Sequence, residues 1–284
     1  MTLLPPPLPD IVLDPIVRLA LSEDLGRAGD LTTDATIPAE TQMSCHIQAR
    51  QSGYLAGLDA AKYALSLIDR DVELTLHMAD GSPLNPGDRI ATLKGSARSI
   101  LTAERVMLNF IGRMSGIATL TAQYVAQTKG TAARIVCTRK TTPGLRAIEK
   151  RAVRCGGGTS HRYGLDDAIL IKDNHIAAAG SIGAVLKRAQ NYAGHLRMIE
   201  IEVDTLEQLG EALPFGPNAV LLDNMDNDTL RKAVAMIGGH CIAEASGGVT
   251  LETVAGIAAT GVDFISVGAL THSAPNLDVG LDAG

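Results

Sequence analysis

Short apolar runs that each end in a polar, charged or glycine residue recur through the second half of the chain. Runs of three or four apolar residues suit buried strands, and the longer segments between them have the spacing of amphipathic helices. This alternation predicts parallel strands joined by helices. The runs are 134–137, 168–171, 199–201, 219–222, 241–243 and 264–267, and the helices are expected at 143–155, 181–193, 205–213, 227–237 and 250–260.

The residues that end these runs are regularly spaced. From Lys172 onward, successive marked residues lie 30, 21, 23 and 22 positions apart, which is the length of a βα unit. Six parallel strands fit a (β/α) barrel or an open doubly wound sheet, and both bind ligands at the carboxyl ends of their strands. The residues expected at those ends from this spacing are Lys172, Glu202, Asp223, Ser246 and Gly268.

The first part of the chain has a different pattern. Strand-like stretches at 43–50, 72–77 and 89–94 are separated by turn signals. A helix is expected over Asp59–Asp69, with Asp59 as its N-cap, and a longer one over 99–128. Together they indicate an α+β domain of about 110 residues that the long helix joins to the second part.

Composition excludes several classes of protein. The 46% apolar content supplies a core, whereas 3% aromatic residues, no Trp and a pI of 5.6 argue against nucleic-acid binding. The four cysteines lack paired spacing, which favours buried free thiols and a cytoplasmic location over disulfides or zinc. No apolar run is long enough for a membrane span. The Pro-rich start, residues 1–7, lacks the features of a signal peptide and is expected to be a loosely held arm.

Positive charge is concentrated in one stretch of this acidic chain. From Arg134 to Lys172 there are nine Lys or Arg residues and three Asp or Glu residues, a local charge of +6. The whole chain carries −6, so the remainder carries −12. Cations on loops beside apolar runs predict a pocket for a small, highly charged anion.

The Lys and Arg residues next to predicted strand ends are expected to be functional, and those on a predicted helix are expected to be solvated. Arg139, Lys140 and Lys172 follow strands, and His161 and Arg162 lie in a glycine-rich loop before one. Arginine grips carboxylates and phosphates through a planar fork, and lysine acts as a compact charge. Three other cations share a predicted helix with an acidic neighbour and are expected to be solvated: Lys150, Arg151 and Arg154.

Two carboxylates, Glu202 and Asp223, end adjacent strands beside this cationic pocket. They suit Mg²⁺ held jointly with substrate phosphates, or stabilisation of a cationic transition state. An internal salt bridge to a barrel lysine is an equally allowed interpretation. Glu200 shares a strand face with Glu202 and is expected to have a supporting role.

Glycine turns follow the last two strands, at Ser246-Gly247-Gly248 and at Val267-Gly268-Ala269. Barrel folds commonly bind phosphate at this position, through backbone N–H groups. The run 156–160 lacks the spacing of a nucleotide-binding loop and is expected to be a hinge. By itself, Arg105 next to Glu104 indicates a surface position, and His175 indicates a capping role.

In combination, these segments closely resemble the quinolinate phosphoribosyltransferase family, also called decarboxylating nicotinate-nucleotide pyrophosphorylases. The resemblance runs in collinear order over nearly the whole chain. The matching segments are Glu23–Gly26, Gly29–Thr33, Thr102–Asn109, Ser115–Thr119, Thr138–Gly144, Ala152–Gly158, His161–Arg162, Gly164–Leu165, Leu170–Ile176, Leu222–Asn224, Glu244–Gly248 and Ser266–Ser273.

The resemblance implies an α/β fold, with an N-terminal α/β sandwich domain over residues 1–113 and an incomplete (β/α) barrel over 114–274. It implies that the tail, 275–284, packs on the first domain. It also implies a pentosyltransferase of NAD biosynthesis that works as a homodimer with shared active sites. The reaction would join quinolinate to phosphoribosyl pyrophosphate with Mg²⁺, giving nicotinate mononucleotide, pyrophosphate and CO₂.

The resemblance also assigns roles to individual residues. One set of residues would bind the quinolinate carboxylates, and the partner subunit would add Arg105 to the same site. Lys140 and Lys172 would contact the phosphates and act in catalysis. Glu202 and Asp223 would face the ribose and Mg²⁺. The carboxylate-binding set is Arg139, His161, Arg162 and Lys172, next to Thr138. The 5′-phosphate would lie on Ser246, Gly247, Gly248, Val267, Gly268 and Ala269.

Two positions depart from the family pattern. Cys137 stands where Asp is usual, and Gly112 where Gln is frequent. Neither replaces a proposed contact, so both bear on supporting interactions rather than on the reaction.

Two other functions stay open from the residues. One is a paralogue with a different acceptor, such as the pyrophosphorylase-like protein of molybdate-transport operons. The other is a non-catalytic phosphate or nucleotide sensor. The retained arginines and Lys172-Asp173-Asn174-His175 favour quinolinate over a monocarboxylate. Glu202 and Asp223 argue against the sensor, because binding alone does not need them.

Overall fold

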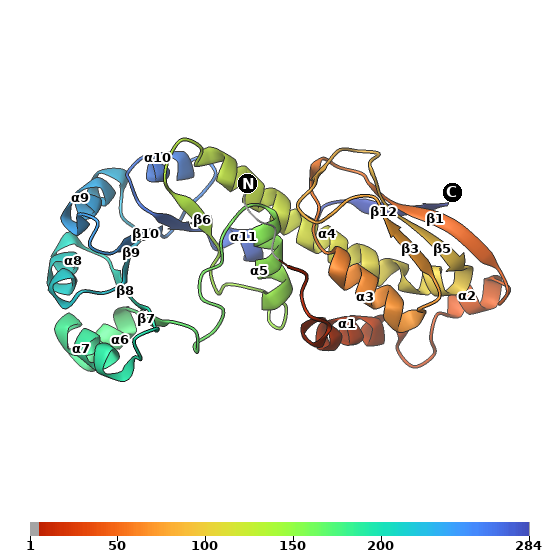
Figure 1. Cartoon of the computed structure of the whole chain (residues 1–284), viewed down its shortest axis with the longest axis horizontal. Helices are drawn as coiled ribbons and strands as arrows, with labels where there is room; N and C mark the ends of the chain where they lie inside the picture. Colours follow the sequence, from red (N-terminus) through yellow and green to blue (C-terminus); the bar gives the residue numbers. More distant parts are fainter. Residues whose placement is uncertain (1–5, 284) are drawn as a thin grey trace. The chain divides into compact units, whose positions relative to one another are not determined.

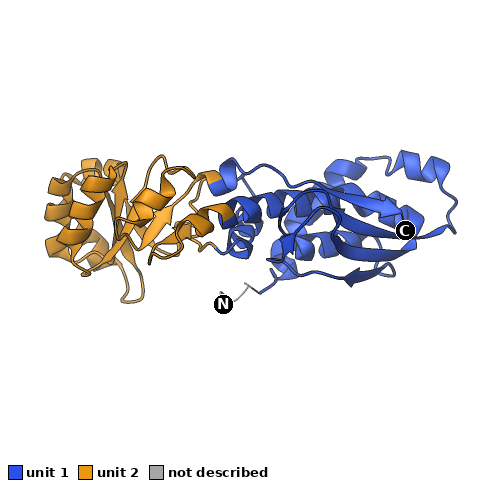
Figure 2. Cartoon of the chain, turned by 90° about the horizontal axis from the view of Figure 1, so that it is seen from above, with its two compact units in different colours: residues 1–122, 141–157, 270–284 blue, residues 123–140, 158–269 orange. Residues whose placement is uncertain are grey.

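The computed structural model describes residues 6–283, which form two compact units (Figure 2). Unit 1 comprises the residues up to 122, residues 141–157 and the residues from 270 onward; unit 2 comprises 123–140 and 158–269. The predicted boundary between residues 113 and 114 falls inside helix α4, Ala97–Gln127. Most of the Pro-rich arm, predicted for residues 1–7, lies outside the described residues.

Unit 1 is built on an antiparallel sheet in the order β12-β1-β5-β3 (Figure 1). In β1 every second residue from Cys45 onward is buried, as expected for a strand with one face on a core. The C-terminal strand β12 pairs with β1, so the end of the chain completes this sheet. The strands are β1 Gln42–Ala49, β3 Glu73–Leu76, β5 Arg89–Ser96 and β12 Val279–Ala283, with a separate pair of β2 Gly53–Tyr54 and β4 Pro83–Leu84.

The helices of unit 1 bury apolar faces. Helix α4 supplies several fully buried side chains, including Ile100, Met107 and Met114. The N-terminal helix α1 was not predicted. The next helix, α2, has Asp30 as its N-cap, which accepts a hydrogen bond from the Thr33 N–H at 3.0 Å. The remaining helices of the unit are α1 Asp10–Leu25, α2 Leu31–Thr36, α3 Leu58–Ile68 and α5 Arg146–Cys155; α11, Ala269–His272, starts at the last residue of unit 2.

Unit 2 contains a parallel sheet of six strands among the described residues, in the order β6-β11-β10-β9-β8-β7. Strands consecutive in sequence from β7 to β11 are neighbours, and β6 pairs with β11 rather than with β7. This order belongs to a barrel left open between β6 and β7, because a doubly wound sheet reverses its direction part-way. The strands are β6 Arg134–Val136, β7 Ile169–Ile171, β8 Ile199–Val203, β9 Ala219–Asp223, β10 Ile242–Ser246 and β11 Phe264–Ser266.

Helices line the outer side of this sheet (Figure 1). They are α6 Asp173–Ala179, α7 Ile182–Tyr192, α8 Leu206–Ala212 with the short η1 Leu213–Phe215, α9 Asn227–Ile237 and α10 Val254–Ala258. Helices α7 to α10 fall where the spacing predicted helices, although α10 is shorter than expected, whereas α6 was not predicted. Within residues 6–283, no helix combines the length and the apolar character that a membrane span requires. All four cysteines are free; Cys241 is half-buried and the others are buried.

Candidate active site

The open barrel gathers the predicted residues at one end of its sheet. Because the strands are parallel, the segments that follow β6, β7, β9, β10 and β11 all lie at the carboxyl edge. Every predicted site residue except Arg105 belongs to unit 2. They are Thr138, Arg139 and Lys140 after β6, His161 and Arg162 before β7, Lys172 after β7, Glu202 in β8, Asp223 and Ser246 ending β9 and β10, Gly247 and Gly248 after β10, and Val267, Gly268 and Ala269 after β11.

Two arginines hold buried nitrogens that the protein leaves without a hydrogen-bond partner. Over the described residues, the Nε atoms of Arg139 and Arg162 are buried and unpaired, as are Ser160 Oγ and Glu200 Oε1. The pKa of Arg162 is lowered, first by burial and then by the nearby charge of Arg139. Buried donors without partners cost stability, and native proteins keep them mainly where function needs them. This pair of arginines, called the cationic pocket below, therefore suits an anion with at least two acceptor groups.

Both ring nitrogens of His161 interact with neighbouring protein groups. The backbone N–H of Arg162 donates to His161 Nδ1 at 2.8 Å, so the ring proton lies on Nε2. Nε2 lies 3.0 Å from a Glu200 carboxylate oxygen and 3.6 Å from one of Glu244. Ser266 donates a hydrogen bond to Glu244. The predicted supporting role of Glu200 thus takes the form of a bond to His161.

Burial and a like charge change the titration of Glu244. Burial, together with the neighbouring Glu200 carboxylate, raises the pKa of Glu244 to about 7, while His161 and Ser266 oppose this rise. Glu244 and Ser266 had no predicted role. The apolar run 241–243 was expected to end before Glu244, whereas β10 extends to Ser246 and carries Glu244 into the buried interior.

Lys172 and Glu202 form an ion pair between the ends of β7 and β8. The Lys172 side chain is 46% exposed and Glu202 only 12%, so the ammonium group faces an open region above a partly buried carboxylate. The salt bridge to a barrel lysine, one of the three interpretations of Glu202, is thus present. His175 Nδ1 accepts a hydrogen bond from the Lys172 backbone N–H at 2.9 Å, the capping role predicted for it.

The segments that follow β9 and β10 pack closely against each other at Gly247. Asn224 has a positive φ of 52°, donates to Asp223 Oδ2 at 2.6 Å, and its backbone N–H donates to the Ser246 carbonyl at 2.9 Å. Gly247 has a φ of 95°, and a Cβ there would lie 2.8 Å from the Asn224 backbone nitrogen. Only glycine allows this approach. The turn predicted to hold phosphate is therefore also packed against the residue after Asp223.

Arg105 lies on α4 of unit 1 and is exposed. Two predictions for residues of unit 1 are wrong. Lys150 and Arg151 were expected to be solvated, but Lys150 is 0% and Arg151 only 6% exposed, while Arg154 is exposed. Asp59 was expected to cap α3, but Gly57 holds that position.

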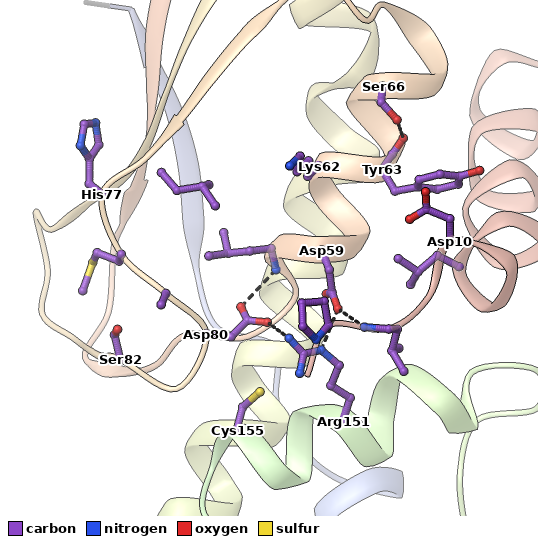
Figure 3. Close-up of a pocket in the computed structure, with 17 residues that line it drawn as sticks. Asp10, Asp59, Lys62, Tyr63, Ser66, His77, Asp80, Ser82, Arg151 and Cys155 are labelled. Atoms are coloured by element: carbon purple, nitrogen blue, oxygen red, sulfur yellow. Dashed lines mark hydrogen bonds and ion pairs between the residues drawn. The ribbon is translucent and has the colours of Figure 1, made fainter. Parts of the chain in front are cut away.

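Arg151 is buried because it meets two carboxylates. Figure 3 shows Asp59 and Asp80 converging on Arg151 in the wall of a cavity of about 950 Å³. Arg151 Nε lies 2.7 Å from Asp59 Oδ2, and a terminal nitrogen lies 3.0 Å from Asp80 Oδ2. Burial raises the pKa of Asp80. The described lining of this cavity includes none of the predicted site residues, so the cluster is a structural one.

Two protein-family models match this chain, one for each half. The family model described as quinolinate phosphoribosyl transferase, N-terminal domain, matches residues 30–115, and the one for the C-terminal domain matches residues 117–282. The chain belongs to this family. It is 46% identical over 260 residues to the probable nicotinate-nucleotide pyrophosphorylase (carboxylating) of Bacillus subtilis, covering 92% of this chain and 89% of that protein.

Other relatives extend the similarity to nearly the full length. The chain is 41% identical over 295 residues to quinolinate phosphoribosyltransferase (decarboxylating) 2b, mitochondrial, of Nicotiana tabacum, covering 98% of this chain and 84% of that one. The solved structure of the nicotinate-nucleotide pyrophosphorylase from Francisella tularensis matches with a TM-score of 0.94 at 37% identity, over 98% of both chains. The family fold, a sandwich domain with an incomplete barrel, is thus confirmed, and the family is one of phosphoribosyltransferases.

Proposed function

We propose that the chain transfers the phosphoribosyl group of phosphoribosyl pyrophosphate to quinolinate and releases CO₂, as a step of NAD biosynthesis. The unpaired Nε atoms of Arg139 and Arg162 carry this proposal. Both are buried, and Arg162 lies close enough to Arg139 for their charges to interact. Two adjacent carboxylates on one ring, as in quinolinate, supply an acceptor for each guanidinium.

Positioning and electrostatics carry the reaction. As the bond between ribose C1 and pyrophosphate loosens, positive charge builds on the sugar, and Glu202 and Asp223 stabilise it from the ends of β8 and β9. Lys140 and Lys172 neutralise the departing pyrophosphate. The quinolinate nitrogen then attacks C1, so that the ring becomes a pyridinium.

The positive ring nitrogen allows the adjacent carboxylate to leave. The electrons of the broken C–C bond remain on ring C2, which takes up a proton to give nicotinate mononucleotide. Backbone groups of the turns at Ser246–Gly248 and Val267–Ala269 hold the 5′-phosphate. No protein nucleophile takes part.

Glu202 and Asp223 also fit Mg²⁺. They would hold the ion through carboxylate oxygens from adjacent strands, the ligand type that Mg²⁺ prefers, together with the substrate phosphates. When bound, the ion neutralises pyrophosphate charge.

An assay with quinolinate, phosphoribosyl pyrophosphate and Mg²⁺ tests this function directly. We expect CO₂ and nicotinate mononucleotide in equal amounts. Lys172→Ala removes the cation beside Glu202, and we expect turnover to fall roughly 100-fold or more. Lys129→Ala, which changes an exposed lysine after α4, serves as the matched control and should keep wild-type turnover.

The outcomes separate the alternatives. Quinolinate binding without product would indicate a sensor, and turnover only with another acceptor would indicate the paralogue. Near wild-type turnover of Lys172→Ala would remove that residue from the mechanism.

We also propose that the active enzyme is a homodimer in which Arg105 of one subunit completes the site of the other. Arg105 is exposed on unit 1, whereas the other proposed substrate-binding residues lie in unit 2. An exposed arginine is available to contact a ligand bound by a second copy.

Mixing two inactive variants tests this sharing. Arg105→Ala and Lys172→Ala, each nearly inactive alone, are unfolded, mixed in equal amounts and refolded. Random pairing places both changes in one site of each mixed dimer and leaves the other site intact, so about a quarter of wild-type activity should return. If Arg105 acts within its own subunit, every site keeps one change and no activity returns.

A further inference from the structure

A buried acidic cluster lies next to the cationic pocket and is not used by the proposed chemistry. Glu200 and Glu244 extend from β8 and β10, and His161 Nε2 approaches both carboxylates, at 3.0 and 3.6 Å. The Glu200 and Glu244 side chains are only 11% and 7% exposed. Two buried carboxylates face a single imidazole, so this cluster carries excess negative charge unless one carboxylate holds a proton.

The charges of the cluster and of the pocket act on each other. Arg162 interacts electrostatically with Glu200 on one side and with Arg139 on the other. In the ligand-free protein, Arg162 therefore offsets part of the negative charge of the cluster. An incoming dianion at Arg139 and Arg162 removes that compensation and adds negative charge of its own.

From this geometry we infer that binding of the dicarboxylate substrate is coupled to the uptake of one proton by Glu244. This inference rests on the proposed function, because it takes quinolinate as the dianion. Glu244 is thus a positioning residue, which acts on the substrate through His161 and Arg162. Protonated Glu244 keeps the pocket cationic when the substrate arrives.

Hydrogen bonding directs the proton to Glu244 rather than to His161. His161 Nδ1 already accepts the Arg162 backbone N–H, so a second ring proton would break that bond. The groups that face Glu244 are Glu200 from β8, His161 from the loop before β7 and the Ser266 hydroxyl from β11.

The size of the effect follows from the charges. The pKa of Glu244 is raised to about 7 before substrate binds, so this carboxyl is part-protonated near neutral pH. One negative charge at about 8 Å, in an effective dielectric of 20, raises the pKa of a carboxyl by roughly 1.5. Because Arg139 and Arg162 offset part of its two charges, a bound dianion raises the pKa of Glu244 by roughly 2 and keeps this carboxyl mostly protonated up to about pH 9.

Calorimetric titration of the full chain with quinolinate measures this uptake. At each pH the binding enthalpy is recorded in buffers that differ in ionisation enthalpy, and its slope gives the number of protons bound. We expect about 0.8 proton per site at pH 8 and about 0.1 at pH 6, where Glu244 is already protonated. The dissociation constant should rise roughly tenfold from pH 6 to pH 8.

Glu244→Gln supplies a permanently neutral side chain. We expect this variant to bind quinolinate without proton uptake and with less than a twofold change in dissociation constant from pH 6 to 8. Ser266→Ala removes a hydrogen bond that favours the charged carboxylate, so uptake at pH 8 should shrink. Glu211→Gln changes an exposed carboxyl on α8 and should behave like the wild type.

These titrations test proton uptake, its assignment to Glu244 and the binding of quinolinate separately. Binding to the wild type with no dependence on the buffer overturns the inference and leaves the proposed function standing. Full uptake in Glu244→Gln overturns the assignment to Glu244. If Glu244→Gln does not fold, the wild-type titration and Ser266→Ala still decide. Failure of the wild type to bind quinolinate overturns the proposed function and the inference together.

Discussion

Replacing Arg162 by alanine is expected to lower kcat/KM for quinolinate about 100-fold, equivalent to roughly 3 kcal/mol. The reason is that Arg162 offers a buried Nε for which the described protein supplies no acceptor. A substrate carboxylate that binds there gains a charge-assisted hydrogen bond without displacing a protein partner. Steady-state kinetics at varied quinolinate measures the change, which should lie mainly in KM.

Two matched variants show whether the planar guanidinium or only its positive charge accounts for the contribution of Arg162 to kcat/KM. Arg162→Lys keeps the charge and loses the planar fork, so we expect it to recover only part of the lost activity. Arg188→Lys changes an exposed arginine on α7 and should keep wild-type kinetics. An unchanged kcat/KM in Arg162→Ala would mean that the carboxylates of the substrate bind elsewhere.

Replacing Arg151 by methionine is expected to lower the free energy of unfolding by about 3–5 kcal/mol. The change leaves Asp59 and Asp80 buried without their shared cation, and the pKa of Asp80 is already raised by burial. Urea unfolding followed by circular dichroism measures the loss.

Arg154→Met is the matched control, because Arg154 lies on the same helix and is exposed. It should change the unfolding free energy by less than about 0.5 kcal/mol. Replacing Arg151, Asp59 and Asp80 together by apolar residues should restore much of the loss. If Arg151→Met matched Arg154→Met, the ion cluster would contribute little to stability.

Short-range patterns predicted the parallel strands and the residues at their ends, whereas the choice of a barrel over an open doubly wound sheet came from the family resemblance. A βα unit has a nearly fixed length, so the spacing from Lys172 to Gly268 placed residues on successive strand ends. The same spacing predicted the glycine turns after β10 and β11. The pairing of Lys172 with Glu202 was open, since a residue type at a strand end does not specify its partner.

Long-range contacts could not be predicted in this way. Arg151 is buried by Asp59 and Asp80, which lie 92 and 71 positions away in the sequence, so its helix alone indicated a solvated cation. Glu244 was missed because the apolar run stops one residue before it, although hydrogen bonding continues β10 to Ser246. A strand that includes a buried carboxylate breaks the apolar pattern on which strand prediction depends.

One departure from the family pattern also has a long-range cause. A side chain at Gly112 would bring its Cβ to 3.0 Å from the Leu277 carbonyl oxygen, and the Leu277 N–H donates to the Gly112 carbonyl at 2.9 Å. The small residue thus lets the C-terminal tail approach α4. Cys137 is buried and its backbone N–H donates to the Thr159 carbonyl at 3.1 Å.

A crystal structure of the protein soaked with quinolinate would show which side chains hold its two carboxylates. We expect one carboxylate oxygen within about 2.7–3.2 Å of the Arg139 guanidinium and another equally close to that of Arg162, with both Nε atoms paired. Quinolinate bound at another site, with these two nitrogens still unpaired, would contradict this expectation.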